Sequence, residues 1–144
     1  MDFDRFKDRS PHTLSGGEAR LAAIAGGLAT KKEIIIMDEP TEELDYHGQL
    51  RIKQIVRGLK EDGNTVLLIS HHSDLLFELC DYFFLWSGSM VNSLEKHELY
   101  RNPDLFTKTG IEIPKILEYA RDRGRLDEFR LAGIVSFEDM ESIL

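Results

Sequence analysis

The sequence predicts an α/β domain with a mainly parallel sheet, followed by a helical tail. Short apolar strands alternate with helical segments up to residue 94, which is the element order of a parallel sheet. An aromatic strand and a Ser-Gly-Ser turn then indicate a hairpin at an antiparallel edge of this sheet. Beyond it only short helical segments follow. We therefore divide the chain into a core, residues 1–94, and a tail, residues 95–144.

The elements of the core follow from residue pattern and spacing. Residues 18–29 are alanine-rich with larger apolar side chains on roughly one face, which predicts a helix. Residues 33–38 and 65–69 each contain an uninterrupted apolar run, typical of fully buried strands. Between them, residues 46–61 place apolar side chains at helical spacing and end before an Asp-Gly-Asn turn, which predicts a second helix.

The other predicted elements are shorter. They are a helix over 74–80 with Ser73 as its N-cap, a hairpin that begins at residue 82, and tail helices over 95–101, 114–123 and 136–143. Ser136 and Asp139 resemble a capping box at the start of the last helix.

Composition excludes several classes of protein. The 144 residues carry 18 Lys+Arg against 26 Asp+Glu, a formal net charge of −8, which argues against a nucleic-acid-binding surface. No apolar run approaches the ~20 residues of a membrane span, and no secretory signal follows Met1. Cys80 is the only cysteine, so no internal disulfide forms and a reducing cytosol is the simplest location.

The first motif with chemical potential is Leu14-Ser15-Gly16-Gly17-Glu18 at a predicted helix start. Two glycines let the backbone approach an anion closely, and the amides of the first helical turn point outward. The Ser15 hydroxyl adds a donor. Taken by itself, the motif fits an ordinary glycine-rich turn with Ser15 as N-cap at least as well.

The second motif is a strand that ends in Asp38-Glu39-Pro40-Thr41. Open α/β sheets bind their ligands at the carboxyl ends of the strands, where these two carboxylates lie. Asp38 is suited to hold Mg²⁺, and Glu39 to orient or deprotonate an attacking water. The alternative is a strand that ends in a solvated acidic turn.

The third motif is a strand that ends in Ser70-His71, where a histidine could donate a hydrogen bond to a terminal phosphate oxygen. The His71-His72 pair also raises the possibility of a metal site. Neighbouring side chains on an extended strand diverge, however, and no third ligand is evident in the sequence.

The order and spacing of these motifs, with Leu44-Asp45 between the second and third, resemble the C-terminal half of an ABC-type ATPase domain. The resemblance covers about residues 10–94. Arg9-Ser10-Pro11 and Ala23-Ile24-Ala25-Gly26 look most like the ATPases of energy-coupling-factor importers for cobalt, nickel or vitamins. The tail, with Gly110-Ile111-Glu112-Ile113-Pro114, resembles their C-terminal extension, which helps to join two such ATPases. The implied fold is a partial P-loop NTPase core.

The resemblance also implies roles for individual residues. Ser15, Gly16, Gly17 and Glu18 would form the signature that covers the γ-phosphate of an ATP held by a second ATPase subunit, in a homodimer or heterodimer. Asp38 would hold Mg²⁺, Glu39 would be the catalytic glutamate and His71 the switch histidine. Asp45 would lie in the loop that signals across the dimer. Transmembrane importer subunits are the other implied partners, which places the protein in the cytoplasm on the inner face of the membrane.

One part of the ABC pattern is missing. The chain has no Gly-Lys dipeptide, so the phosphate-binding loop GxxxxGK[ST] cannot be fitted. We therefore expect the chain alone to be inactive and to need a P-loop from another chain or segment. The sequence is equally compatible with a truncated product, a split gene or a short expression product. Without the P-loop strand, we expect an open sheet edge that another element covers.

Two other functions fit parts of the sequence. A non-catalytic remnant could act as a regulatory or dimerising module through its helical tail. The C-terminal lobe of an SMC-like DNA-maintenance ATPase would carry the same signature. That lobe should follow a long coiled coil and present a basic surface, which the acidic balance does not favour.

Overall fold

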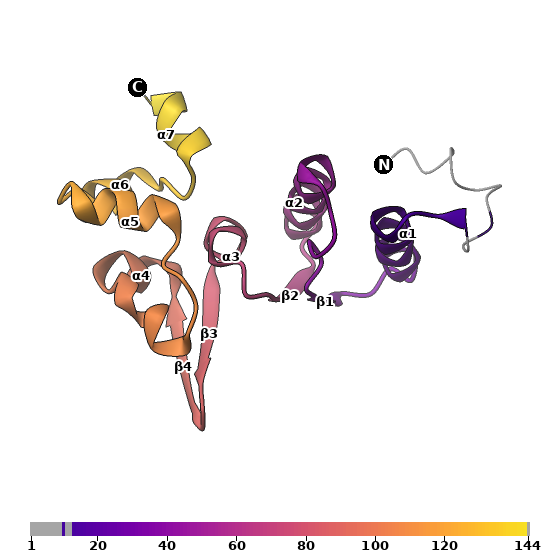
Figure 1. Cartoon of the computed structure of the whole chain (residues 1–144), viewed down its shortest axis with the longest axis horizontal. Coiled ribbons are helices and arrows are strands. Elements are labelled where there is room, and N and C mark those ends of the chain that lie inside the picture. The colour runs from indigo at the N-terminus through magenta and orange to yellow at the C-terminus, as the bar shows by residue number, and fades with distance from the viewer. Residues whose placement is uncertain (1–9, 11–12, 144) are drawn as a thin grey trace. The chain divides into compact units, whose positions relative to one another are not determined.

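The computed structural model describes residue 10 and residues 13–143, which divide into two compact units (Figure 1). The N-terminal unit comprises residues 1–69 and the C-terminal unit residues 70–144. This structural division precedes the hairpin, and the functional boundary after residue 94 stays a prediction.

The N-terminal unit contains two helices and a parallel pair of strands. Its elements are α1 (Gly16–Leu28), β1 (Ile34–Asp38), α2 (Tyr46–Glu61) and β2 (Thr65–Ile69). The strands pair in register from Ile34 with Thr65 to Asp38 with Ile69. The bounds of α2 and β2 agree with those predicted from the sequence. The crossover through α2 thus brings the carboxyl ends of both strands to one edge.

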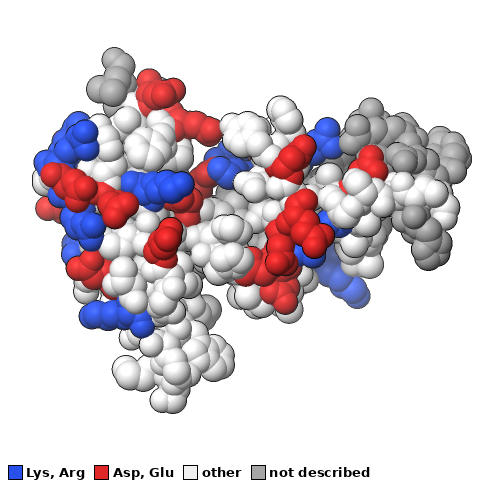
Figure 2. All heavy atoms as spheres, viewed as in Figure 1, with Lys and Arg blue, Asp and Glu red and all other residues white. Residues whose placement is uncertain are grey.

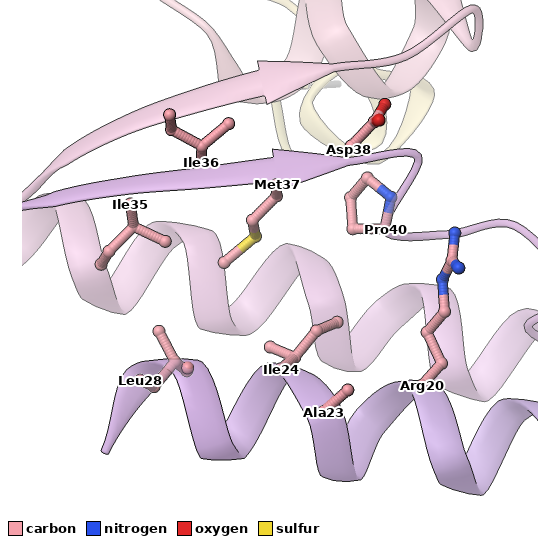
Figure 3. Close-up of a pocket in the computed structure, with 10 residues that line it drawn as sticks. Arg20, Ala23, Ile24, Leu28, Ile35, Ile36, Met37, Asp38 and Pro40 are labelled. Carbon is pink, nitrogen blue, oxygen red and sulfur yellow. The ribbon is translucent and has the colours of Figure 1, made fainter. Parts of the chain in front are cut away.

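Only one face of this sheet is covered. Ile35 and Met37 point from β1 toward the helices, whereas Ile36 points away from them (Figure 3). The opposite face leaves four aliphatic side chains exposed by 43 to 66 %: Ile34, Ile36, Leu67 and Ile69. The prediction of fully buried strands is therefore wrong for this unit, because the described residues supply no layer for the second face.

The C-terminal unit begins with helix α3 (Ser73–Leu79) and the hairpin of β3 (Tyr82–Ser87) and β4 (Met90–Glu95). The hairpin was expected to extend the parallel sheet. Within the described residues it forms a separate two-stranded sheet, so this expectation is corrected. The alternation in β3 buries Phe83 and Leu85 on one face and exposes Tyr82, Phe84 and Trp86 on the other.

The tail of the C-terminal unit consists of short helices. These are α4 (Lys96–Arg101), the 3₁₀ turns η3 (Pro103–Leu105) and η4 (Thr107–Thr109), α5 (Lys115–Asp122), α6 (Leu126–Ala132) and α7 (Phe137–Ile143). Helix α6 was not predicted. It has seven residues and is capped at its C-terminus by Gly133, which has a φ of 68°.

The two caps predicted in this unit have different outcomes. The Asp139 carboxylate accepts hydrogen bonds from the amide and hydroxyl of Ser136, and the Asp139 amide donates back to the Ser136 hydroxyl oxygen, as predicted. Ser73 is not the N-cap of α3. His72 occupies that position, and Ser73 is a buried residue of the helix itself.

Aromatic and aliphatic side chains fill the core of the C-terminal unit. Phe77, Phe106 and Phe129 are fully buried, as are Leu99 and Leu117. The Tyr100 ring packs against Phe77, and its hydroxyl donates to the Ile134 carbonyl at 2.7 Å. Burial raises the pKa of Tyr100 to about 12, with a smaller contribution from the charge of Asp139.

Candidate functional site

The Ser15-Gly16-Gly17-Glu18 turn opens α1 as a reciprocal cap. The Glu18 amide donates to the Ser15 hydroxyl oxygen at 3.3 Å, and the Ser15 amide donates to the Glu18 carboxylate at 3.0 Å. The amides of Gly16 and Gly17 lie in the first turn, where an α-helix offers them no internal acceptor. The sequence signal for this reciprocal cap is the Ser-x-x-Glu spacing, from which only the N-cap role of Ser15 was expected.

The two predicted acidic residues lie at the carboxyl end of β1. Asp38 is exposed, and Glu39 is half-buried. The Glu39 amide donates to the Ile69 carbonyl at 2.9 Å, which fixes this residue beside the end of β2. Glu39 has a φ of 43°, a left-handed conformation that costs a non-glycine residue roughly 1–2 kcal/mol. This backbone is held in place by its hydrogen bonds.

The loop that follows β1 lies against the start of α1. A Cβ added at Gly16 would come within 3.1 Å of the Glu43 carboxylate, and one at Gly17 within 3.2 Å of the Leu44 side chain. Glu43 also has a positive φ, 61°. The absence of side chains at these glycines therefore allows the signature turn and the acidic loop, residues 39–45, to lie in contact.

Arg20 makes a further link between α1 and the acidic loop. Its guanidinium donates a hydrogen bond to the Glu39 carbonyl and lies 3.6 Å from the Glu42 carboxylate. The same carbonyl accepts the Glu42 amide at 3.2 Å. No local pattern in the sequence indicates Arg20, because its partners lie about twenty residues away and meet it only in the folded unit.

Two other residues of the acidic loop have structural environments of their own. Asp45 is the N-cap of α2 and accepts the Gly48 amide at 2.7 Å, a role that the sequence analysis did not assign to it. Thr41 is buried, and its hydroxyl has no hydrogen-bond partner. The acidic loop thus ends in a hydrogen-bonded helix cap and contains a buried hydroxyl, that of Thr41, without a hydrogen bond.

A largely apolar cavity of about 280 Å³ separates part of α1 from β1 (Figure 3). Its walls include Ala23, Ile24 and Leu28 from the helix. Arg20 and Asp38 line it as well, and both lie toward the same end in the close-up. Apolar packing between α1 and β1 is therefore incomplete, and Arg20 lies at one end of the gap.

His71 belongs to the C-terminal unit. Its exposed ring lies beside that of His72, with 4.2 Å between centroids, and the His72 amide donates to the Ser70 hydroxyl oxygen at 3.1 Å. In the sequence His71 follows Ile69, the partner of Glu39, by two residues. The joint action of Glu39 and His71 stays a prediction.

Comparison with known proteins bears on these motifs. Residues 1–42 match the model of the ABC transporter family. The energy-coupling factor transporter ATP-binding protein EcfA of Methanoculleus marisnigri is 36% identical over 129 residues, which are 86% of this chain and 47% of that protein. The chain corresponds to part of an ABC transporter ATP-binding protein.

Other relatives of this ABC-type chain agree. EcfA2 of Lactococcus lactis is 30% identical, with 95% of this chain and 46% of the relative aligned. CbiO1 of Clostridium perfringens, described as part of the ABC transporter complex CbiONQ, superposes with a TM-score of 0.59 at 29% identity. The superposition covers 82% of this chain and 48% of CbiO1. The chain therefore spans about half the length of the relatives it matches.

A further superposition supports the fold alone. A putative metal-chelate type ABC transporter in an inward-facing conformation matches with a TM-score of 0.64 at 22% identity, over 71% of this chain and 41% of that one. The fold is thus a partial P-loop NTPase core of the ABC type. No helix among the described residues is both long and apolar enough to cross a membrane.

The donor groups of the ABC-type chain fit ATP and Mg²⁺ in part. The exposed Asp38 carboxylate is a hard oxygen ligand of the kind that Mg²⁺ prefers. The amides of Gly16 and Gly17 at a helix N-terminus are suited to phosphate oxygens. The Glu18 carboxylate lies at the same helix start, where its negative charge opposes that of a phosphate.

Proposed function

We propose that this chain supplies the signature and the water-handling groups of an ATP-hydrolysing subunit in an energy-coupling-factor-type importer. One observation carries the proposal. The signature turn and the loop that begins with Glu39 lie in contact within one unit, through Gly16, Gly17 and Arg20. A phosphate-facing turn and a carboxylate suited to activate water are thereby held on one scaffold.

The proposed roles follow the chemistry of each group. Ser15, Gly16 and Gly17 donate hydrogen bonds to the γ-phosphate of an ATP held by the second ATPase subunit, and Glu18 completes the signature. Asp38 holds Mg²⁺, usually through water, which neutralises phosphate charge when bound. Glu39 orients the attacking water or accepts its proton. His71 donates a hydrogen bond to a terminal phosphate oxygen, and Asp45 contributes to communication across the ATPase dimer.

The P-loop must come from another polypeptide segment, since the chain lacks GxxxxGK[ST]. We propose that this segment covers the open face of the β1–β2 sheet. The relatives are about twice as long as the part that aligns with this chain. The aliphatic side chains on that face are exposed, whereas the other face of the same sheet packs against the helices. A missing domain half, similar in size to this chain, would account both for the greater length of the relatives and for the exposed sheet face.

The proposed assembly contains a second ABC ATPase subunit and transmembrane importer subunits, on the inner face of the cell membrane. The cargo is a metal ion or a vitamin. Cobalt, nickel and vitamins are equally compatible with the sequence. On the face seen in Figure 2, acidic and basic side chains are interspersed without a continuous basic patch, which does not favour the DNA-maintenance alternative.

The test is hydrolysis of Mg-ATP by the reassembled domain. The chain is combined with the segment of the Methanoculleus relative that it does not align with, and turnover is compared for wild type and Glu39→Gln. We expect Glu39→Gln to lower kcat by about 100-fold or more and to leave ATP binding largely intact. Glu61→Gln, an exposed acid at the end of α2, is the matched control. Equal turnover of Glu39→Gln and wild type would contradict the proposed role.

A further inference from the structure

The contact between α1 and the acidic loop contains a residue to which no role has been assigned. Arg20 lies one turn into α1, and its side chain is 31 % exposed. Its guanidinium reaches the Glu39 carbonyl and the Glu42 carboxylate together. An arginine suits such a site because its planar group donates in several fixed directions.

Among the described residues, three hydrogen bonds hold the Glu39 backbone. Its amide donates to the Ile69 carbonyl at 2.9 Å, and its carbonyl accepts the Glu42 amide at 3.2 Å and the Arg20 guanidinium. Two of these partners lie on β2 and in the loop itself. Arg20 is the partner that comes from the signature helix.

Because Glu39 has a positive φ, its backbone conformation depends on these hydrogen bonds. At 43° the residue occupies a region that non-glycine residues avoid, so the conformation persists only while its surroundings hold it. Because the side chain leaves from the same Cα, a change in this backbone redirects the carboxylate. The cavity between α1 and β1 means that apolar packing alone does little to fix the helix at this point.

We propose that Arg20 is a positioning residue. It fixes the orientation of the Glu39 carboxylate and makes that orientation depend on the position of the signature helix, α1. The inference rests on the proposed function of Glu39. A movement of α1 that loosens the Arg20 contact would release the Glu39 backbone, and a movement that tightens it would fix the carboxylate. Engagement of the signature turn by a phosphate would thereby be coupled to the water-activating group.

The first test measures the contact in the chain itself, without nucleotide. Hydrogen exchange is compared for wild type, Arg20→Ala, Arg20→Gln and Arg20→Lys. We expect the Glu42 amide, which bonds to the Glu39 carbonyl, to exchange at least about 5-fold faster in Arg20→Ala, and α2 amides to be unchanged. Arg51→Ala, an exposed arginine of α2, is the control. Unchanged exchange at Glu42 in all three Arg20 variants would overturn the proposal.

The second test measures turnover of Mg-ATP in the reassembled domain. We expect Arg20→Ala to lower kcat by about 10-fold or more with KM within about 2-fold, since it disturbs placement rather than nucleotide binding. Arg20→Lys should restore part of kcat, and Glu42→Gln should cost less than Arg20→Ala. An unchanged kcat in Arg20→Ala, or a loss that appears only in KM, would overturn the proposal. If wild type shows no turnover, the proposed function fails, and the exchange result decides for or against the contact independently.

Discussion

The two units of the chain differ in the size of their enclosed cores. The C-terminal unit encloses three phenylalanines, whereas the N-terminal unit has Ile52 as its fully buried large side chain among the described residues and leaves four aliphatic strand residues exposed. The unit that carries Ser15, Asp38 and Glu39 is thus the one with the open sheet face. The difference indicates that the candidate chemistry belongs to a unit that needs a further layer. The C-terminal unit encloses an aromatic core of its own, although one face of its hairpin is also exposed.

The largest expected effect contrasts an enclosed side chain with an exposed one. Phe106→Ala should lower the free energy of unfolding of the C-terminal unit by about 3–5 kcal/mol, because Phe106 is fully buried and meets Phe83 edge to face. Ile36→Ala, at 65 % exposure, should cost at most about 1 kcal/mol. Urea unfolding followed by circular dichroism and by the fluorescence of Trp86 measures both. Similar costs for the two changes would remove the contrast between the units.

A second experiment asks what covers the open face. Ile36 and Leu67 are paired across β1 and β2, and each is exposed. Changing both to lysine should alter the stability of the chain itself by no more than about 1 kcal/mol. It should weaken capture of the P-loop segment by about 10-fold or more, because docking would bury two charges. Isothermal titration of the two components gives the affinity.

The matched control for this face is Gln54→Lys, on an exposed position of α2. It adds one of the two positive charges of the lysine pair to the same unit, away from the sheet. If the lysine pair and the control bind the P-loop segment with the affinity of wild type, the open face is not the docking surface.

A smaller effect sharpens the account of the C-terminal core. Tyr100→Phe removes the hydrogen bond to the Ile134 carbonyl and should lower the free energy of unfolding by about 1 kcal/mol at pH 8. The pKa of Tyr100 is raised to about 12 in the folded unit, above the value near 10 of an unfolded tyrosine. The stabilisation is therefore complete below pH 10 and is lost as the pH rises from 10 to 12.

Unfolding free energies at pH 8 and pH 11 test this dependence. Wild type should lose stability over this range by more than Tyr100→Phe does. Tyr82→Phe, at an exposed position, should behave as wild type. Parallel pH profiles for wild type and Tyr100→Phe would contradict a role for the buried hydroxyl.

Local sequence signals predicted the regular elements well. The α2 bounds follow from the apolar spacing and the Asp62-Gly63-Asn64 turn, and β2 follows from an apolar run between polar ends. The cap at Asp45 was not predicted. Burial was less predictable. The apolar run that contains Ile34 and Ile36 reads the same whether or not a second layer of structure covers that face of the sheet. The hairpin was predicted from its turn. Whether it joins the parallel sheet or forms a separate one depends on tertiary structure, which local sequence does not show.

The candidate site was predictable as residue types and order, but not as contacts. Ser15, Asp38 and Glu39 were recognisable from motifs at element ends. The link through Arg20 and the left-handed backbone of Glu39 were not, since both arise from pairing between segments distant in sequence. His72 replaced Ser73 as the cap of α3 because the helix starts one residue earlier than its hydroxyl pattern suggested.

The most direct test of the central claim is a calorimetric titration with Mg-ATP, first of the chain alone and then with the P-loop segment present. The account predicts no measurable binding by the chain alone, because its sequence lacks the P-loop GxxxxGK[ST] that cradles the β- and γ-phosphates. With the P-loop segment added, it predicts binding, with heat of hydrolysis that Glu39→Gln removes. Tight binding of Mg-ATP by the chain alone, or none by the combined components, would contradict it.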